Sequence, residues 1–130
     1  MSSRTVDARG SVSAFVTCIV GALVTLSLLM FETGRYIDRY LEVSDVAENA
    51  SRVGAQSIVG IRAGTPHIDQ RSATLAANRF LGENGLNGHV RIDGLRITVS
   101  VSTIWRPMGV SVLGERRIAL SRSASVFGEG

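Results

Sequence analysis

The stretch of uncharged residues between Arg9 and Glu32 constrains this chain more than any other part of its sequence. It covers residues 10–31 and reads GSVSAFVTCIVGALVTLSLLMF. At about 1.5 Å of rise per residue, the stretch forms about 33 Å of helix, which is enough to cross a hydrocarbon core of about 30 Å. In lipid a helix satisfies its own backbone hydrogen bonds, so the β-branched residues here do not oppose helix formation. We therefore predict a transmembrane helix over residues 10–31.

Two alternatives stay open for this stretch: a cleaved secretory signal and a buried core helix. A signal has an apolar region of about 7–15 residues that ends in a small-x-small cleavage site. The stretch here is longer and ends in LMFE, which favours an uncleaved anchor. The single cysteine, Cys18, precedes most of the apolar residues and so does not fit a lipoprotein signal. One cysteine also excludes an internal disulfide framework and a Cys-rich zinc site.

The two flanks of the stretch differ in size rather than in charge. Arginines precede and follow it in near-equal number, so the positive-inside rule does not fix the orientation. Residues 1–9 are too few to fold, whereas residues 32–130 can form a domain, and long domains are translocated largely regardless of charge. We expect a single-pass protein of the cell membrane with a cytoplasmic tail over residues 1–9 and an extracytoplasmic α+β domain over residues 32–130.

Periodicity predicts two helices in that domain. An apolar stripe at three- and four-residue spacings extends the first helix to about Arg62 without a proline. Gly64-Thr65-Pro66 is then the expected end of that helix. A second, short helix is expected from about Asp69 to Glu83, with Asp69 as its N-cap and Gly85 just beyond its C-terminus. The predicted stripe of the first helix consists of Ile37, Leu41, Ala47, Ala50, Gly54, Ile58 and Ile61.

After Gly85 the apolar period changes from 3.6 to 2, which is typical of strands. Residues 90–93 and 95–102 alternate apolar and polar side chains, and Asp93-Gly94 between them is a strong hairpin signal. Residues 118–127 form a third alternating run, and residues 106–114 read as an apolar loop. The sequence therefore predicts an α+β fold: a transmembrane helix that continues into a long helix, a short second helix, and a three-stranded antiparallel sheet packed on one side.

The sequence offers no candidate catalytic, cofactor-binding or metal-binding residue. His67 and His89 are far apart and lack the spacing of a metal site, and no phosphate-binding loop, nucleophile elbow or zinc-protease motif occurs. Trp105 is expected to cover the edge of the core. With 14 basic residues, all arginine, against 11 acidic ones and no dense basic run, nucleic-acid binding is not expected either. We expect no enzyme activity, no cofactor and no small-molecule substrate.

Small residues recur at every fourth position of the predicted transmembrane helix. Ser13, Thr17, Gly21 and Thr25 form a stripe of small residues, and the small residues Ala14, Cys18 and Ala22 beside it widen the stripe into a broad face that lets another membrane helix approach closely. The alternative, which stays open, is that the stripe is a chance feature of a segment rich in small residues.

Three motifs together resemble the TadE/TadG-like proteins of tight-adherence (Flp-type IVb) pilus assembly, especially the small actinobacterial type. The first motif is RGSVSAF at the start of the apolar stretch, and the second is ETGR at its exit. The third is a small-residue helix that follows. An arginine-rich, lysine-free chain also suits a GC-rich genome. The residues that carry the third motif are Asp45, Ala47, Ala50, Gly54 and Ala55.

The resemblance implies a membrane protein that serves pilus biogenesis as a structural or minor-pilin-like component, with a pilin-like fold. Its partners would be other pilus-assembly membrane proteins or pilins. A prepilin peptidase would cut after Gly10 and leave Ser11 as the new N-terminus. The glutamate that pilins carry five residues into the mature helix falls at Phe15 here, which favours an unprocessed, TadG-like anchor. A membrane-anchored extracytoplasmic binding module unrelated to pili is the alternative function.

Overall fold

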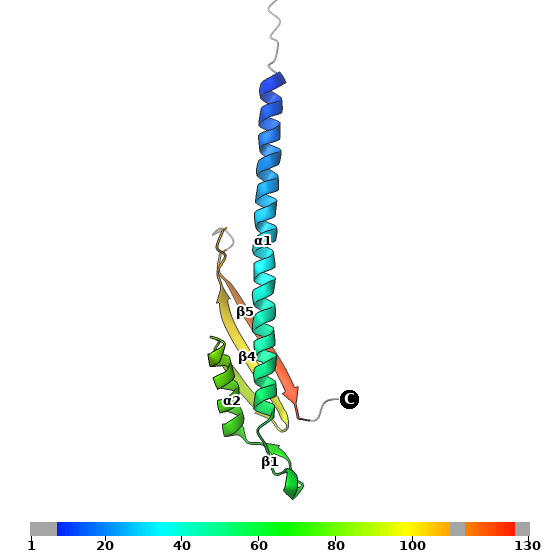
Figure 1. Ribbon diagram of the computed structural model, residues 1–130, viewed down its shortest axis with the longest axis vertical. Coiled ribbons are helices and arrows are strands. Elements are labelled where there is room, and N and C mark those ends of the chain that lie inside the picture. Colours follow the sequence, from blue (N-terminus) through cyan, green and yellow to red (C-terminus); the bar gives the residue numbers. More distant parts are fainter. Residues whose placement is uncertain (1–7, 110–113, 127–130) are drawn as a thin grey trace, which may run out of the picture.

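One unbroken helix forms the axis of the molecule. The computed structural model describes residues 8–109 and 114–126, and its first element is α1 (Ala8–Ala55), 48 residues long. Residues 10–31 of α1 are exposed throughout, and this part extends beyond every other element (Figure 1). By length and composition, α1 is long enough and apolar enough to cross a membrane.

The second part of α1 packs into the core through small side chains. Val43, Ala47 and Ala50 have no exposed surface, and Gly54 is buried one turn further on. Ile37 and Leu41, which the sequence places on the same apolar stripe, are not buried with these residues, because they are 50% and 53% exposed. The reason is their angular position. Neighbouring residues of a helix point about 100° apart, and Tyr36 rather than Ile37 packs against the core.

The prediction that the helix continues to Arg62 is wrong, because α1 ends at Ala55. The β-branched residues that follow form the short strand β1 (Ile58–Val59), which pairs antiparallel with β2 (His67–Ile68). Between these strands, Gly60 has a φ of 80° and begins the 3-10 helix η1 (Ile61–Ala63). Ile58 and Ile61, predicted for the helical stripe, therefore lie in a strand and in an exposed turn. A left-handed glycine and a pairing partner further along the chain override the local helical period.

The second helix, α2 (Gln70–Glu83), begins and ends as predicted. The Asp69 carboxylate caps it by accepting a hydrogen bond from the Arg71 backbone N–H at 3.2 Å. At the other end Gly85 has a φ of 68° and the Leu86 N–H donates to the Leu81 carbonyl at 2.9 Å. This is the Schellman arrangement, in which the residue after the left-handed glycine also packs on the helix. Leu81 and Leu86 are both buried.

The predicted three-stranded antiparallel sheet is confirmed. Its strands are β3 (Gly88–Asp93), β4 (Arg96–Trp105) and β5 (Arg116–Ser125), and they lie in that order. Asp93 pairs with Arg96, so the hairpin loop consists of Gly94, with a φ of 62°, and Leu95. The described part of the 106–114 loop lies between β4 and β5, and its residues 110–113 lie outside the described ranges.

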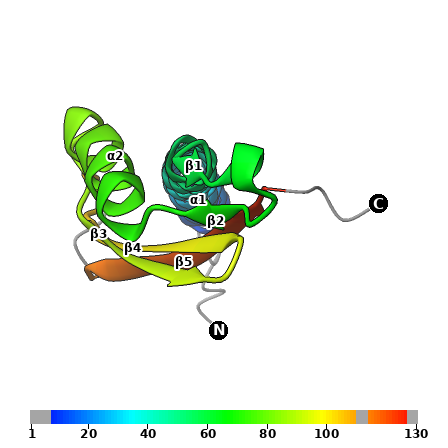
Figure 2. The same cartoon turned by 90° about the horizontal axis from the view of Figure 1, so that it is seen from below.

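The helices cover one face of this sheet, as predicted. Seen along its axis, α1 lies above the sheet with α2 beside it, and no described element covers the opposite sheet face (Figure 2). The inward side chains alternate along the strands and meet the small residues of α1. The α+β fold predicted from the sequence is thus observed. The strand residues buried between the layers are Ile97, Val99, Val101, Trp105, Ile118 and Leu120.

Candidate functional site

The connection between β4 and β5 is held against α1 at the point where the uncharged stretch ends. Glu32, the first charged residue after that stretch, is 3% exposed. Its Oε1 accepts a hydrogen bond from the Gly109 backbone N–H at 2.8 Å. One turn further on, Arg35 Nη2 lies 2.9 Å from the sulfur of Met108. These contacts join α1 to a segment more than 70 residues away in the chain.

Two aromatic rings continue this junction. The Tyr36 ring meets the Trp105 ring edge to face, with centroids 5.4 Å apart and an interplanar angle of 83°. Trp105 ends β4 and is 8% exposed, which confirms its predicted place at the edge of the core. Its register partner is Arg116, the first residue of β5. Together these residues line a cavity of about 110 Å³, and the full set is Leu29, Glu32, Thr33, Tyr36, Trp105 and Arg116.

The hydrogen bonding of the Glu32 carboxylate in this junction is incomplete. The second oxygen of Glu32, Oε2, is buried and has no hydrogen-bond partner among residues 8–109 and 114–126. The nearest cationic contact is Arg35 Nη1, 3.9 Å from Oε1. An unsatisfied buried carboxylate oxygen is costly, so the junction favours a further hydrogen-bond donor near Glu32. Arg116 is the cationic side chain that lines the same cavity.

The sequence shows Glu32 at the end of the uncharged stretch and in the ETGR motif, but it does not indicate that this side chain is buried. Its Gly109 contact spans 77 residues, so no local spacing indicates it. A second long-range contact was missed for the same reason: Arg122 Nε donates to Ser44 Oγ at 3.0 Å, which joins β5 to α1. The sequence signal that could have singled out Glu32 is its position. It directly follows the apolar stretch, and Arg35 comes three residues later, on the same side of a helix.

The predicted small-residue stripe lies in the exposed part of α1. Ser13, Thr17, Gly21 and Thr25 are all exposed, and a Cβ atom added to Gly21 would meet nothing within 4 Å. Thr17 Oγ1 donates to the Ser13 carbonyl at 2.9 Å, and Thr25 Oγ1 donates to the Gly21 carbonyl at 2.8 Å. The hydroxyl hydrogens of Thr17 and Thr25 are therefore already used in hydrogen bonds within the helix. Close packing by another helix at this stripe stays a prediction.

The predicted peptidase site lies near the start of the same helix. Gly10 and Ser11 are both exposed residues of α1, which begins at Ala8. A Cβ atom at Gly10 would meet nothing within 4 Å. Cleavage between these two residues stays a prediction.

The residues of the third motif act mainly in packing. Ala47, Ala50, Gly54 and Ala55 are buried, while Asp45 is exposed on another side of α1. A Cβ atom at Gly54 would lie 3.0 Å from Ile97 Cδ1 and 3.3 Å from the Ala73 carbonyl oxygen. The motif thus lets α1 approach both α2 and β4 at once.

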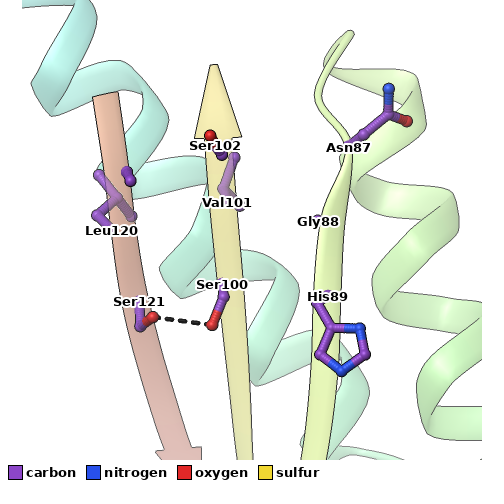
Figure 3. A pocket seen from close by; sticks show the side chains of 9 residues that line it. Asn87, Gly88, His89, Ser100, Val101, Ser102, Leu120 and Ser121 are labelled. Carbon is purple, nitrogen blue, oxygen red and sulfur yellow. Dashed lines mark hydrogen bonds between the residues drawn. The ribbon is translucent and has the colours of Figure 1, made fainter. Parts of the chain in front are cut away.

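The uncovered face of the sheet carries a second hollow, which is wide and shallow. The hydroxyl oxygens of Ser100 and Ser121 lie 2.8 Å apart in it, and His89 lies on the adjoining strand (Figure 3). This hollow offers hydroxyl, amide and imidazole groups to a polar partner. Among residues 8–109 and 114–126, no group of three or more histidine, cysteine or carboxylate side chains is arranged to hold a metal ion. The hollow is lined by Asn87, Gly88, His89, Ser100, Val101, Ser102, Ala119, Leu120 and Ser121.

The two hollows lie at different places in the fold, one beside α1 at the end of β4 and the other on the outer face of the sheet. The junction around Glu32 joins α1 to the end of the sheet, at the point where the uncharged part of α1 ends. The outer sheet face presents polar groups away from the helices. Comparison with models of protein families, with curated proteins and with solved structures found no match to this chain.

Proposed function

We propose that this chain is a single-pass membrane component of a tight-adherence (Flp-type) pilus assembly system, TadE/TadG-like, with a structural or minor-pilin-like role and no enzyme activity. The observation that carries the proposal is the continuity of α1 from an exposed, uncharged first part into the core of an α+β domain. Residues 10–31 are the membrane anchor and residues 32–130 are the extracytoplasmic domain. The three motifs that resemble this family lie on the same helix.

The continuity of α1 suits a structural role. No loop or proline separates the anchor from the domain, and about 24 residues of helix follow Phe31, or about 36 Å. The Glu32–Gly109 hydrogen bond holds the end of the sheet against the helix where it leaves the membrane. Partners that contact the anchor and partners that contact the domain are therefore kept at a fixed separation.

Deletion of the gene in the organism that carries it tests the role in pili. A strain that lacks the gene should lose surface pili in electron micrographs, and the full-length chain supplied from a plasmid should restore them. A chain whose residues 10–31 are replaced by an unrelated transmembrane helix should restore them less well, because the small-residue stripe is lost. Normal piliation without the gene contradicts the proposal.

A membrane-anchored binding module unrelated to pili is the second candidate. It is favoured by the polar hollow on the uncovered sheet face, which is free to meet a partner. The neighbourhood of the gene distinguishes the two candidates. Genes for a secretion ATPase, tandem membrane platform proteins and small prepilins beside it support the pilus role, and their absence favours the binding module.

The orientation of the domain is directly testable. We expect the C-terminus to lie outside the cytoplasm, because the long domain rather than the short tail is translocated. Protease added to intact cells stripped of their wall should digest a tag at the C-terminus. A tag that is protected until the cells are lysed would reverse the orientation.

The proposed anchor is expected to keep its first ten residues. Phe15 occupies the place of the glutamate that pilins carry, so we expect little cleavage between Gly10 and Ser11. The intact mass of the protein extracted from membranes measures this. A dominant species that begins at Ser11 would instead assign the chain to the processed, pilin-like type.

A further inference from the structure

A second apolar stripe runs along α1 on a side that the domain does not cover. Its positions alternate spacings of four and three residues over nearly four heptads, and all are exposed. The two that lie furthest from the N-terminus, Ile37 and Leu41, are 50% and 53% exposed. We call this stripe the heptad seam. It consists of Val16, Val20, Leu23, Ser27, Met30, Gly34, Ile37 and Leu41.

The period of the seam is that of a helix pair. A strict seven-residue repeat keeps an apolar seam facing a second helix when the two wind around each other with a left-handed twist. Within residues 10–31 apolar side chains lie on every side of the helix, so the repeat is distinguished by Ile37 and Leu41, which continue it beyond the uncharged stretch. Five of the eleven residues from Glu32 to Glu42 are charged, yet none of the charges falls on the seam.

Lipid does not account for the far end of the seam. Leu41 is ten residues beyond Phe31, which corresponds to about 15 Å of helix. The sheet and α2 do not cover this side either, because Ile37 and Leu41 remain about half exposed. Ile37 and Leu41 therefore present apolar surface among charged neighbours, which is typical of a surface that another protein covers.

We propose that the occupant is a second copy of this chain, packed parallel and in register along the heptad seam. Two copies anchored in one membrane share depth and direction, so each seam residue meets its own counterpart. The seam positions Ser27 and Gly34 are small, and a Cβ atom at Gly34 would meet nothing within 4 Å, so two backbones can approach there.

The residues beside the seam suit such a pair. In a parallel pair with heptad packing, the residue just before every second seam position lies across from the residue five places later in the other helix. Those seam positions here include Gly34 and Leu41. Tyr40 of one copy then meets Asp45 of the other, so a hydroxyl donor faces a carboxylate. Thr33 lies across from Asp38 at the same spacing, while its hydroxyl donates to the Leu29 carbonyl of its own helix at 2.8 Å. No pair of like charges is brought together along the seam.

The pairing rests on the proposed membrane anchor but not on a role in pili. It also leaves the small-residue stripe free for other partners. Gly21 and Leu23 point about 200° apart around the helix, at about 100° per residue.

Cysteine cross-linking of the full chain in its membrane tests the pairing. In a Cys18→Ser background, Ile37→Cys and Leu41→Cys place a thiol on the seam. Glu42→Cys, in the same turn but on another side, is the matched control because the Glu42 side chain is 59% exposed. After mild oxidation we expect at least tenfold more disulfide-linked dimer from each seam variant than from Glu42→Cys.

The outcomes separate the pairing from the anchor. Extraction of membranes at alkaline pH first shows whether the chain is integrated, and a chain released there contradicts the anchor itself. An integrated chain that gives no dimer, or equal dimer at all three positions, overturns the pairing. A linked product with the mass of another protein also overturns it, because the occupant is then not a second copy.

A double variant provides an independent measurement. Ile37→Asp with Leu41→Asp should turn the dimer into a monomer in mild detergent, as measured by light scattering during size exclusion. The unfolding midpoint, followed by Trp105 fluorescence, should stay the same because both side chains are exposed. A double variant that stays dimeric contradicts the pairing.

Discussion

The two parts of α1 are one continuous helix that meets its surroundings in opposite ways. Residues 10–31 expose large apolar side chains on every side. From Val43 onward the buried face consists largely of alanine, serine and glycine, which bring the helix close to the sheet and to α2. A helix in lipid is held by its own backbone hydrogen bonds, whereas a helix in water depends on tertiary packing. The small side chains of the second part follow its close packing, and the large exposed side chains of residues 10–31 suit the proposed membrane setting.

Hydroxyl groups follow the same division. In the first part, Thr17, Thr25 and Ser27 donate to carbonyls four residues earlier in the helix itself. In the second part, Ser44 accepts a hydrogen bond from Arg122 of β5. Polar groups are thus satisfied within the helix where it stands alone, and partly across the layers where it is packed.

The same substitution made in both parts should give the largest contrast. Gly54→Leu places new atoms against Ile97 and the Ala73 carbonyl oxygen, and overpacking of this kind costs about 3 kcal/mol of unfolding free energy. Gly21→Leu should leave the domain unchanged, because nothing lies near Gly21. Chemical unfolding of the full chain in detergent micelles, followed by Trp105 fluorescence, measures both effects.

Equal stability of the two glycine variants would show that α1 does not pack closely on β4 and α2. Gly54→Ala sharpens the comparison, because its single added carbon meets Ile97 Cδ1 at 3.0 Å. We expect its loss of stability to lie between those of the other two.

The junction between the two parts should show an intermediate effect. Glu32→Ala removes the acceptor of the Gly109 N–H and should cost about 1 kcal/mol, because loss of the unsatisfied Oε2 offsets part of the penalty. Hydrogen exchange of the Gly109 amide should become faster. Glu42→Ala is the control on the exposed side of α1 and should leave that amide unchanged.

Glu32→Gln separates the hydrogen bond from the charge. Its side-chain oxygen still accepts from Gly109, so protection of that amide should persist. Fast exchange at Gly109 in the glutamine variant would contradict a neutral acceptor role and would show that the charge itself holds the connection.

The smallest effect is expected far from α1, at the cap of α2. The Ser72 hydroxyl, 2.5 Å from Oδ2, with the backbone N–H groups and charge of Arg71, holds the pKa of Asp69 below its ordinary value of 3.8. A lowered pKa stabilises the fold above pH 3.8, and that contribution is lost as the pH falls through the folded-state pKa. Asp69→Ala should slightly lower the urea midpoint at pH 7, and the difference from wild type should shrink at pH 3. A difference that grows in acid would contradict the cap.

Local signals predicted most of this fold. The cap at Asp69, the stop at Gly85 and the Asp93-Gly94 turn each act within a few residues, so sequence alone indicates them. The end of α1 was misplaced because the pairing of β1 with β2 competes with a helical pattern that continues past it.

Periodicity also failed to separate two apolar stripes on one helix. Ile37 and Leu41 have the spacing of an apolar helical stripe. That spacing does not show whether the stripe packs against the core of this chain or faces outward. The buried neighbours Tyr36 and Val43 belong to the core side, and only the position of the sheet shows this. The burial of Glu32 is not predictable from local spacing because its hydrogen-bond partner, Gly109, is distant in sequence.

Because α1 continues without a break from Phe31 into the domain, the two parts of the helix tilt together as one rigid rod. In the proposed membrane setting, any inclination of residues 10–31 is transmitted to the whole domain, since no joint absorbs it. Membrane helices incline by about 20° on average, and more when their apolar length exceeds the bilayer thickness. Over the about 36 Å of helix beyond Phe31, such an inclination displaces the far end sideways by about 12 Å. Bilayer thickness thereby sets how far the polar sheet face reaches from its anchor.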